Sequence, residues 1–292
     1  MRHYRLANGA AIPALGLGTW RMGESTRRRA AEVAAVRDAL AMGYRLIDTA
    51  EMYGEGGAES VIGAALADAL RAGDLRREEL FVVSKVYPHH ASRDGTLAAC
   101  DRSRARLGVD RIDLYLLHWR GGHPLHDTCS AMQRLLAHKH ISAWGVSNFD
   151  TKDMVELLRV QRELGIAPGT AEGCATNQVY YSLRERGPEF DLLPWMRAQH
   201  MPLMAYSPID QGALAAEPAL RGPAKRLGIS STQLALAWIL AQHEVVAIPK
   251  AVRVAHLREN LAAAQIRLTT ADLAELNRLF PGPQRKTSLS VL

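Results

Sequence analysis

The chain has 292 residues, of which 48% are hydrophobic and 23% are charged, a composition typical of a globular protein with a sizeable core. The formal net charge of +6 suits an anionic ligand, but the only dense basic cluster, Arg27–Arg29, has no interleaved aromatic residues, so we expect no nucleic-acid partner. Cys100, Cys129 and Cys174 are too widely spaced for a disulfide framework, which favours a cytoplasmic protein. Residues 1–18 lack a signal-peptide stretch and no apolar run reaches transmembrane length, so we expect no membrane association.

The first predicted element is a β-hairpin over Tyr4–Pro13. Asn8 and Gly9 lie there between apolar neighbours, and this dipeptide is the strongest short-range signal for a two-residue hairpin turn. The hairpin precedes the first strand of the repeating pattern that follows. We therefore expect it to cover one end of the sheet that this pattern forms.

Beyond the hairpin, short apolar runs alternate with longer amphipathic stretches, a pattern that predicts βα units and parallel strands. The runs predicted as strands are Leu15–Gly18, Arg45–Asp48, Leu80–Lys85, Ile112–His118, Ser142–Ser147, Ala175–Val179, Pro202–Ser207 and Val245–Pro249. The stretches predicted as helices are Arg27–Met42, Ala58–Leu70, Arg93–Leu107, Asp127–His138, Thr151–Leu164, Leu192–His200, Thr232–Ala241 and Val254–Ala264.

Eight such units in a chain of this length favour a closed (β/α)8 TIM barrel, with an open doubly wound sheet as the alternative. Thr270–Leu279 follows a threonine cap and carries leucines at helical spacing, which predicts an additional helix. The tail Pro281–Leu292 is expected to be irregular and to lie on the surface. The predicted fold class is thus α/β, a TIM barrel with an N-terminal β-hairpin and an extra C-terminal helix, in a single domain over residues 1–292.

Four polar residues lie at or just past the ends of three predicted strands: Asp48, Tyr53, Lys85 and His118. Each alone has an ordinary structural explanation as a cap, a packed ring or an extended surface chain. In a barrel of parallel strands, however, these ends converge on one mouth. A buried ammonium there needs a counter-charge, which Asp48 can supply to Lys85. The set therefore indicates a proton-transfer site.

The chemistry of this site follows from its groups. A phenol has a pKa of about 10, and a nearby Lys85 cation is expected to lower the pKa of Tyr53. Asp48 holds Lys85 in place and keeps it charged. A neutral His118 can polarise a carbonyl oxygen, which Tyr53 then protonates. Because no activated serine or cysteine accompanies the group, we expect a hydride from a bound cofactor to attack the carbonyl carbon.

At this point the chain resembles the aldo-keto reductases over Leu6 to Leu279. The segments that carry the likeness, in order, are Gly43–Gly54 (GYRLIDTAEMYG), Val83–Val86 (VSKV), Leu114–Trp119 (LYLLHW), Trp144–Phe149 (WGVSNF), Thr176–Gln178, Tyr206–Pro208 and Ile248–Lys250. Within the family, DTAEMY, VSKVYP, LYLLHW and IPKA are most similar to the bacterial methylglyoxal reductase type. The resemblance implies reduction of small aldehydes, ketones or α-ketoaldehydes such as methylglyoxal with NADPH (NADH being possible), by a monomer.

The resemblance also implies roles for individual residues, with Tyr53 as general acid. Ser147, Asn148 and Gln178 should hold the nicotinamide carboxamide, and Tyr206 should stack on the nicotinamide ring. The residues expected to bind the cofactor are Thr19, Trp20, Asp48, Ser147, Asn148, Gln178, Tyr206, Ser207, Ile209, Gln211, Ile248, Lys250, Ala251, Val252, Arg253, His256, Glu259 and Asn260. Side chains placed after strands one to four predict a substrate pocket of Trp20, Met22, Tyr53, Tyr87, His118 and Trp119, although aromatic and methionine side chains are often core.

The end of the last strand independently predicts a phosphate site. Lys250 ends that strand and Val254 opens a helix, and in this barrel the loops after strands seven and eight usually bind phosphate at a helix N-terminus. Arg253 can add positive charge. A basic loop that merely caps the helix is the alternative interpretation.

The chain departs from the family pattern at several positions near the cofactor. Ala251 replaces a serine, and His256 replaces an arginine that binds the 2′-phosphate, so the NADPH preference is weakened unless Arg253 substitutes. Asp210 stands where many members have glycine, and its role is left open. Arg120 replaces a proline, and the short segment 120–126 predicts an open substrate pocket.

Two other functions remain possible from the sequence. Lys85 is a candidate Schiff-base nucleophile of an aldolase, although Asp48 favours a charged lysine. A non-catalytic, NADPH-binding, redox-responsive auxiliary subunit is the other alternative. No metal site is expected, because His89–His90 and His138–His140 lack partner carboxylates at ligand spacing.

Overall fold

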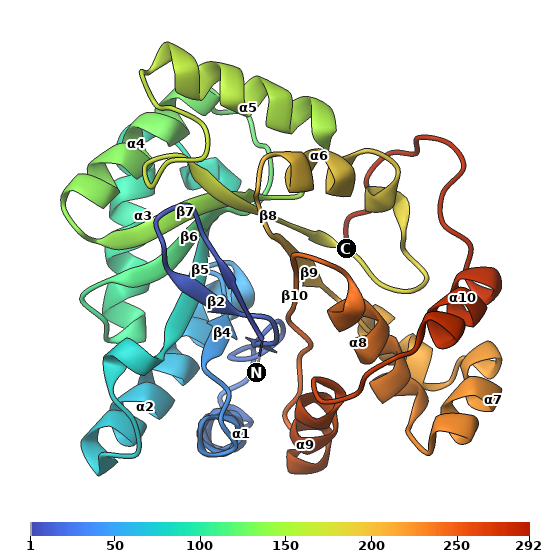
Figure 1. Cartoon of the computed structure of the whole chain (residues 1–292). Coiled ribbons are helices and arrows are strands. Elements are labelled where there is room, and N and C mark those ends of the chain that lie inside the picture. Colours follow the sequence, from blue (N-terminus) through green and yellow to red (C-terminus); the bar gives the residue numbers. More distant parts are fainter. Residues whose placement is uncertain (1) are drawn as a thin grey trace.

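The structure, a computed structural model, describes residues 2–292 and arranges them as a barrel of parallel strands surrounded by helices (Figure 1). In this part of the chain eight strands pair in sequence order, each parallel to its neighbours. They are β3 (Leu17–Gly18), β4 (Leu46–Asp48), β5 (Phe81–Val86), β6 (Ile112–Leu117), β7 (Ile141–Ser147), β8 (Cys174–Tyr180), β9 (Leu203–Tyr206) and β10 (Val245–Ala247). The predicted (β/α)8 fold is confirmed.

The sheet closes between its first and last strands. Gly18 bridges Lys250 in parallel register, and the Gly16 N–H donates a hydrogen bond to the Ala247 carbonyl at 2.9 Å. A Cβ atom on Gly18 would lie 2.6 Å from the Ile248 carbonyl oxygen, so glycine is needed for the two segments to approach this closely. Closure excludes the open doubly wound sheet.

Alternate strand positions fill the barrel interior, as the two-residue period of a strand requires. Along β6, Leu114 and Leu116 join the interior cluster, whereas Tyr115 between them packs outward against the helices. Val83 on β5 also faces inward. Lys85, two residues further along β5, therefore points to the same side, toward the carboxyl end of the barrel interior.

Helices cover the outside of the barrel (Figure 1). They are α1 (Arg29–Ala41), α2 (Gly57–Ala72), α3 (Arg93–Leu107), α4 (Leu125–Ala137), α5 (Thr151–Glu163), α6 (Leu192–Ala198), α7 (Pro218–Leu227), α8 (Ser231–Ala241), α9 (Val254–Ala263) and α10 (Thr270–Leu279). Short 3-10 helices are η1 (Tyr53–Gly56), η2 (Arg77–Glu79), η3 (Pro88–His90), η4 (Gly187–Glu189) and η5 (Asp210–Ala215). None of the helices between residues 2 and 292 is long and apolar enough to cross a membrane.

The predicted N-terminal hairpin is present and seals the amino-terminal end of the barrel. Its strands β1 (His3–Arg5) and β2 (Ala11–Pro13) pair antiparallel. Leu6 and Ile12 from the hairpin are buried in the same cluster as the inward-facing strand residues. The opposite, carboxyl-terminal end of the barrel is left for the site.

The turn of this hairpin differs from the prediction. Three residues, Ala7–Gly9, separate the closing pair, because the Leu6 N–H donates to the Ala10 carbonyl at 2.9 Å. The last of the three has a φ of +84°, the left-handed conformation that a glycine adopts at no cost. Asn8 is the middle residue of the three, and its amide donates to the Ser142 carbonyl at 2.8 Å and ties the hairpin to β7. The predicted two-residue turn is therefore wrong.

Two other segments differ from the sequence-based expectations. Pro218–Leu227 forms helix α7, although Gly222 and Pro223 within it are typical of a loop. The tail Pro281–Leu292 is irregular as predicted, but its end returns to the barrel mouth (Figure 1). There the Leu292 N–H donates to the Tyr206 hydroxyl at 3.4 Å.

Candidate active site

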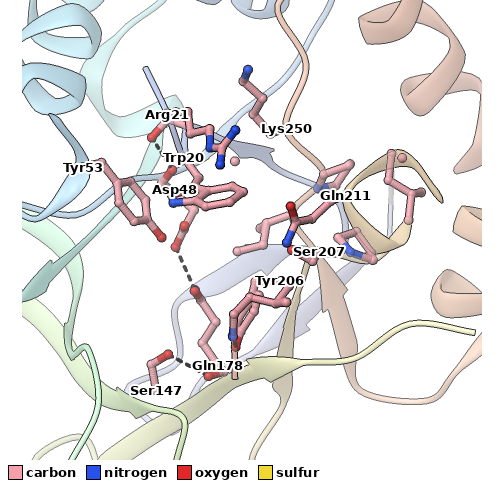
Figure 2. Close-up of a pocket in the computed structure, with 18 of the residues that line it drawn as sticks. Trp20, Arg21, Asp48, Tyr53, Ser147, Gln178, Tyr206, Ser207, Gln211 and Lys250 are labelled. Atoms are coloured by element: carbon pink, nitrogen blue, oxygen red, sulfur yellow. Dashed lines mark hydrogen bonds between the residues drawn. The ribbon is translucent and has the colours of Figure 1, made fainter. Parts of the chain in front are cut away.

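A cavity of about 980 Å³ opens where the carboxyl ends of the strands converge (Figure 2). Most of the residues predicted for cofactor, substrate or catalysis line it, although they come from nearly all parts of the sequence. The structure brings together Thr19, Trp20, Asp48, Tyr53, His118, Trp119, Ser147, Asn148, Gln178, Tyr206, Ser207, Ile209, Gln211, Ile248, Lys250, Arg253, His256, Glu259 and Asn260.

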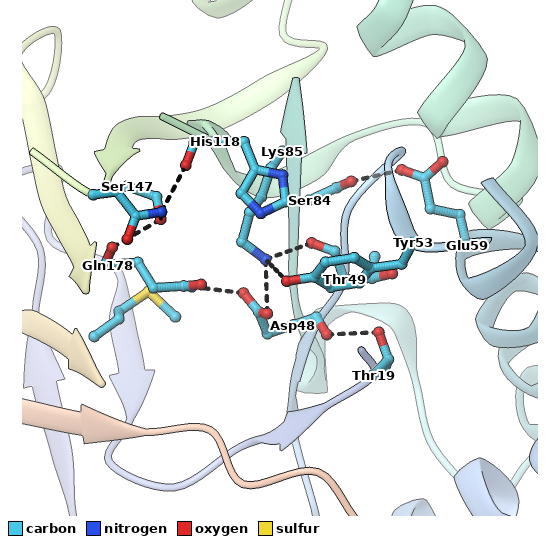
Figure 3. Close-up of polar contacts among 12 residues, drawn as sticks. Thr19, Asp48, Thr49, Tyr53, Glu59, Ser84, Lys85, His118, Ser147 and Gln178 are labelled. Carbon is cyan, nitrogen blue, oxygen red and sulfur yellow. Dashed lines mark hydrogen bonds and ion pairs between the residues drawn. The ribbon is translucent and has the colours of Figure 1, made fainter. Parts of the chain in front are cut away.

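Lys85 lies fully buried beneath this cavity and contacts three oxygen atoms (Figure 3). Its Nζ is 2.7 Å from Asp48 Oδ2, 2.8 Å from the Thr49 carbonyl oxygen and 3.4 Å from the Tyr53 hydroxyl. The other oxygen of Asp48 accepts a hydrogen bond from Gln178 Nε2 at 2.7 Å. Burial lowers the pKa of Lys85, and the Asp48 carboxylate opposes this shift. The pair is thus held rigidly at the floor of the site.

Tyr53 follows β4 at the start of η1 and presents its hydroxyl to the cavity above Lys85. Burial raises its pKa well above 10.0, and the negative charge of Asp48 adds to that effect. The expected lowering by Lys85 is therefore wrong for this site. The physical reason is that desolvation of the buried phenol is the largest effect on its pKa, and the Asp48 carboxylate raises the pKa further.

His118 lies directly after β6, and its ring is 5.6 Å from the Tyr53 ring at an interplanar angle of 72°. Burial, followed by the charge of Lys85, holds the pKa of His118 well below 6.5. The imidazole is therefore neutral at neutral pH, the state in which we expect His118 to polarise a carbonyl oxygen. Its Nδ1 atom is buried and has no hydrogen-bond partner within residues 2–292.

Side chains beside the quartet are fixed by hydrogen bonds to one another. The Ser147 hydroxyl donates to the Gln178 carbonyl at 2.8 Å. Asn148, with a φ of 59°, donates from its amide to the His118 carbonyl at 3.2 Å and accepts from the Tyr206 hydroxyl at 2.9 Å. Gln178 Oε1 accepts no hydrogen bond from any residue of the described chain, so this oxygen is free to accept from a bound carboxamide.

Cationic side chains also line the cavity, and two of them, Arg21 and Lys250, are labelled in Figure 2. Arg21, Lys250 and Arg253 form no ion pair with a carboxylate of residues 2–292. The Arg21 guanidinium lies 4.6 Å from the centre of the Trp20 ring, and Arg253 Nη2 contacts His256 Nε2. Cations without a carboxylate partner fit the phosphates of a nicotinamide dinucleotide, and the amide groups of Asn148 and Gln178 fit its carboxamide.

Asp210, whose role the sequence leaves open, belongs to the loop after β9. It does not line the cavity. Its carboxylate accepts from the Tyr180 hydroxyl and from Arg184 Nη1, the latter at 3.3 Å. The added negative charge is therefore directed away from the cofactor-binding residues.

Two residues predicted for the substrate pocket do not reach the cavity. Met22 is fully buried in the core, because a turn that contains Arg21 at φ 65° directs the following side chain back toward the helices. Tyr87 packs edge-on against Trp119 at 5.1 Å and against His89 at 3.9 Å, so it lies behind the pocket wall. Met22 and Tyr87 are therefore not among the residues that line the cavity, and their contact with a substrate stays a prediction.

Ala251 and Val252 were expected at the cofactor but do not line the cavity. Ala251 is buried, whereas Val252 is exposed on the outer side of the segment between β10 and α9. Lys250 and Arg253 on either side of them do line the cavity, because the chain turns there to begin α9.

Several lining residues were not predicted from the sequence. Arg21 and Met52 could have been found, because each directly adjoins a predicted site residue at a strand end. Thr232 on α8 and the tail residues Val291 and Leu292 carry no such signal, since only the folded chain brings them to the mouth.

Comparison with known proteins agrees with this geometry. A model of the aldo/keto reductase family matches residues 14–280. Methylglyoxal reductase YeaE of Escherichia coli is 43% identical over 293 residues, covering 99% of this chain and 98% of that protein. A glyoxal reductase of Bacillus subtilis is 33% identical over 275 residues, covering 94% and 91%. A crystal structure of an aldo-keto reductase from Klebsiella pneumoniae in complex with NADPH has a TM-score of 0.90 and 45% identity, covering 100% of this chain and 99% of that one.

Proposed function

The chain belongs to the aldo/keto reductase family and is an NADP-dependent oxidoreductase, and we propose that it reduces small aldehydes, ketones or α-ketoaldehydes such as methylglyoxal, with Tyr53 as general acid. The observation that carries the proposal is the position of Lys85 beneath the cavity. Its Nζ lies 2.7 Å from Asp48 Oδ2 and 3.4 Å from the Tyr53 hydroxyl. When bound, NADPH supplies a hydride to the carbonyl carbon.

Tyr53 delivers the proton in this proposal. Because its pKa is raised, the hydroxyl is protonated at neutral pH and is ready to donate to an oxygen on which negative charge develops. Loss of that proton leaves a phenolate 3.4 Å from Lys85 Nζ, and the lysine charge stabilises it. Asp48 fixes Lys85 at this distance, so the pair acts after the donation rather than by ionising the resting phenol.

His118 orients the carbonyl. A neutral imidazole carries one N–H, and a proton on the buried Nδ1 would have no partner in the described chain. This favours the tautomer that carries the proton on Nε2. That N–H is the donor we assign to the carbonyl oxygen, next to Tyr53.

The cofactor would be held at two ends by different chemistry. Gln178, with Ser147 and Asn148, would hold the carboxamide, and Tyr206 would stack on the nicotinamide ring. The phosphates would meet the cationic group formed by Arg21, Lys250 and Arg253, while His256, Glu259 and Asn260 line the same end of the cavity.

The names of the relatives and the pocket wall support a small dicarbonyl substrate. One relative is named as a methylglyoxal reductase and another as a glyoxal reductase. In this chain Trp20, Met52 and Trp119 line the cavity near Tyr53, and Arg120 beside them is paired with Glu156 at 2.6 Å. A largely aromatic and apolar wall suits a small uncharged carbonyl compound.

The aldolase alternative is disfavoured by the position of Lys85. Its ammonium is buried and held by Asp48 and Thr49, and it does not line the cavity. A Schiff-base nucleophile needs an unprotonated amine within reach of the substrate.

The test compares Tyr53→Phe with the parent protein, using NADPH oxidation with methylglyoxal as the assay. We expect kcat/KM to fall roughly 10²- to 10⁴-fold, while quenching of protein fluorescence by NADPH is unchanged. Tyr4→Phe is the matched control, because it removes a hydroxyl at the opposite end of the barrel. Retained turnover in Tyr53→Phe would overturn the assignment, and NADPH binding without turnover in the parent protein would favour the auxiliary-subunit alternative.

We also propose that the protein acts as a cytoplasmic monomer without nucleic-acid partners. Cys100, Cys129 and Cys174 are all buried free thiols, which suits a reducing compartment. Large exposed apolar side chains such as Val155, Phe190 and Val252 come from separate elements of the chain. Light scattering coupled to size exclusion should give the mass of one chain, 32.0 kDa.

A further inference from the structure

The loop that follows β9 has an unusual backbone. Ser207, Asp210 and Gln211 have φ angles of 48°, 52° and 51°, and Gly212 has a φ of 96°. For residues other than glycine the left-handed conformation is unfavourable, because the Cβ atom lies too close to the following carbonyl oxygen. Such a run persists only where contacts elsewhere hold it in place.

Asp210 is the member of this loop that points away from the cavity. Ser207, Pro208, Ile209, Gln211 and Gly212 all line the cavity, and Asp210 does not. The strained backbone therefore presents its neighbours to the cavity while turning the Asp210 carboxylate outward, toward β8 and the segment after it.

Two partners hold the Asp210 carboxylate there. The Tyr180 hydroxyl donates to Oδ1, and Arg184 Nη1 lies 3.3 Å from Oδ2. Tyr180 is buried, with 7% of its surface exposed, whereas the Arg184 side chain is 49% exposed. The Tyr180 contact should dominate, because solvent screens the exposed ion pair.

Tyr180 also contacts the other end of the cofactor-binding region. Its ring stacks on the Tyr206 ring at 5.8 Å and 16°. The Tyr206 hydroxyl in turn donates to Asn148, whose amide donates to the His118 carbonyl. One buried tyrosine thus links the strained loop to the residues assigned to the nicotinamide.

We propose that Asp210, through Tyr180, is a positioning residue that latches the loop 207–212 in its cavity-facing conformation and so slows the release of NADPH. The proposal rests on the proposed placement of the cofactor in this cavity. Without the latch, the left-handed residues relax toward ordinary φ values and withdraw Ser207 and Gln211 from the cavity. Cofactor release is then faster, whereas the quartet on the barrel floor keeps its geometry.

The experiment measures the rate at which NADPH leaves the protein, by stopped-flow fluorescence after mixing the complex with excess NADP⁺. We expect Asp210→Asn and Tyr180→Phe each to raise this rate about tenfold, the usual effect of losing a hydrogen bond to a charged group. The double variant should release NADPH no faster than the single variants, because both remove the same contact. Asparagine tolerates the left-handed conformation, and phenylalanine keeps the ring that stacks on Tyr206.

Tyr181→Phe is the matched control. Tyr181 directly follows β8, and its hydroxyl donates to Glu189 at 2.7 Å rather than to Asp210, so its removal should leave release unchanged. Single-turnover reduction of methylglyoxal and the melting temperature should also be unchanged in Asp210→Asn and Tyr180→Phe, which separates positioning from a general structural role. An NADPH release rate that is unchanged in both single variants would overturn the latch but not the proposed function. The same holds if the effects of the two substitutions on this rate are fully additive in the double variant. A parent protein that does not bind NADPH would overturn both the latch and the proposed function.

Discussion

Burial sets the ionisation state of individual residues in this site, and a pH profile follows from it. Tyr53 has its pKa raised above 10.0 and His118 has its pKa held below 6.5. Between these values the phenol is protonated and the imidazole is neutral. Because reduction needs the phenolic proton, activity should be lost only as the pH rises through the raised pKa.

We therefore expect kcat/KM for methylglyoxal reduction to be level between pH 6.5 and 10.0 at saturating NADPH. The measurement is a series of initial rates in overlapping buffers of equal ionic strength. An alkaline decline centred well inside that range would show that Lys85 lowers the pKa of Tyr53 after all.

The buried pair of Asp48 and Lys85 leads to a prediction about stability. Lys85→Met leaves the Asp48 carboxylate buried without its cation, and we expect the free energy of unfolding to fall by about 3–5 kcal/mol. Adding Asp48→Asn removes that charge while an amide can still meet Gln178, so the double variant should regain part of the loss. Urea denaturation of the two single variants and the double variant measures this coupling. Simple additivity would contradict it.

The choice between NADPH and NADH is expected to depend on Arg253. This side chain lines the cavity, contacts His256 and has no carboxylate partner in the part of the chain that the structure describes. Arg253→Ala should weaken NADPH binding about tenfold or more and leave NADH binding nearly unchanged, because NADH lacks the 2′-phosphate. Fluorescence titrations with both cofactors test this. Arg258→Ala, an exposed position on the helix α9 that follows Arg253, is the control.

Which individual residues reach the cavity was predictable mainly where a strand end fixes the direction of the side chain. Asp48 and His118 follow from the two-residue period of their strands, and both line the cavity. Met22 lies four residues beyond the end of β3, where backbone torsions decide the direction of a side chain and no periodicity predicts it. Tyr87 directly follows β5, so the strand period alone would turn it inward after Lys85, but its ring packs against Trp119 and His89. A residue type suited to a pocket is equally suited to the core.

Among the elements, the N-terminal hairpin is expected to contribute to the stability of the fold but not to catalysis. Ile12 is fully buried in the barrel interior at the end opposite to the cavity. Ile12→Ala should lower the free energy of unfolding by about 2–5 kcal/mol through loss of buried surface and the cavity it leaves. The value of kcat/KM at a temperature where the variant is folded should stay close to that of the parent protein. A matching loss of activity would show that the hairpin also supports the site.

Element boundaries were predictable where capping residues mark them. Ser92 accepts from the Gly95 N–H and Gly108 takes a φ of 66°, so α3 begins and ends at the residues predicted. Helix α7 was missed because Pro223 lies inside it, and packing of its buried face overrides that local preference. The same holds for the tail, whose return to the mouth depends on contacts such as Ser290 with Glu185, far apart in the sequence.

At the scale of the whole molecule, the barrel separates the part that stabilises the fold from the part that binds ligands. The family model covers residues 14–280, while the hairpin before it and the tail after it pack onto opposite ends of the same barrel. We keep the proposal that the range 1–292 is one domain, although Met1 lies outside the described residues. A single cooperative transition, coincident by circular dichroism and fluorescence, is the observation that checks it.

The net charge of +6 and the unpaired cations at the mouth together predict electrostatic steering of the cofactor. Raising the ionic strength from about 0.01 M to about 0.15 M shortens the screening length from roughly 30 Å to roughly 8 Å. The association rate of NADPH should therefore fall over this range, whereas kcat/KM for an uncharged carbonyl at saturating NADPH should hardly change. Stopped-flow mixing at several salt concentrations gives the slope.

Two substitutions that each remove one positive charge can show whether the steering comes from the cations at the mouth or from the net charge of the whole molecule. Arg21→Gln removes a cation that lines the cavity, and Arg162→Gln removes an exposed cation of α5 that does not. If the local field at the mouth attracts the cofactor, only Arg21→Gln flattens the salt dependence of the association rate. If both variants flatten it equally, the overall charge of the molecule is responsible, and the cationic group at the mouth acts only after NADPH has arrived.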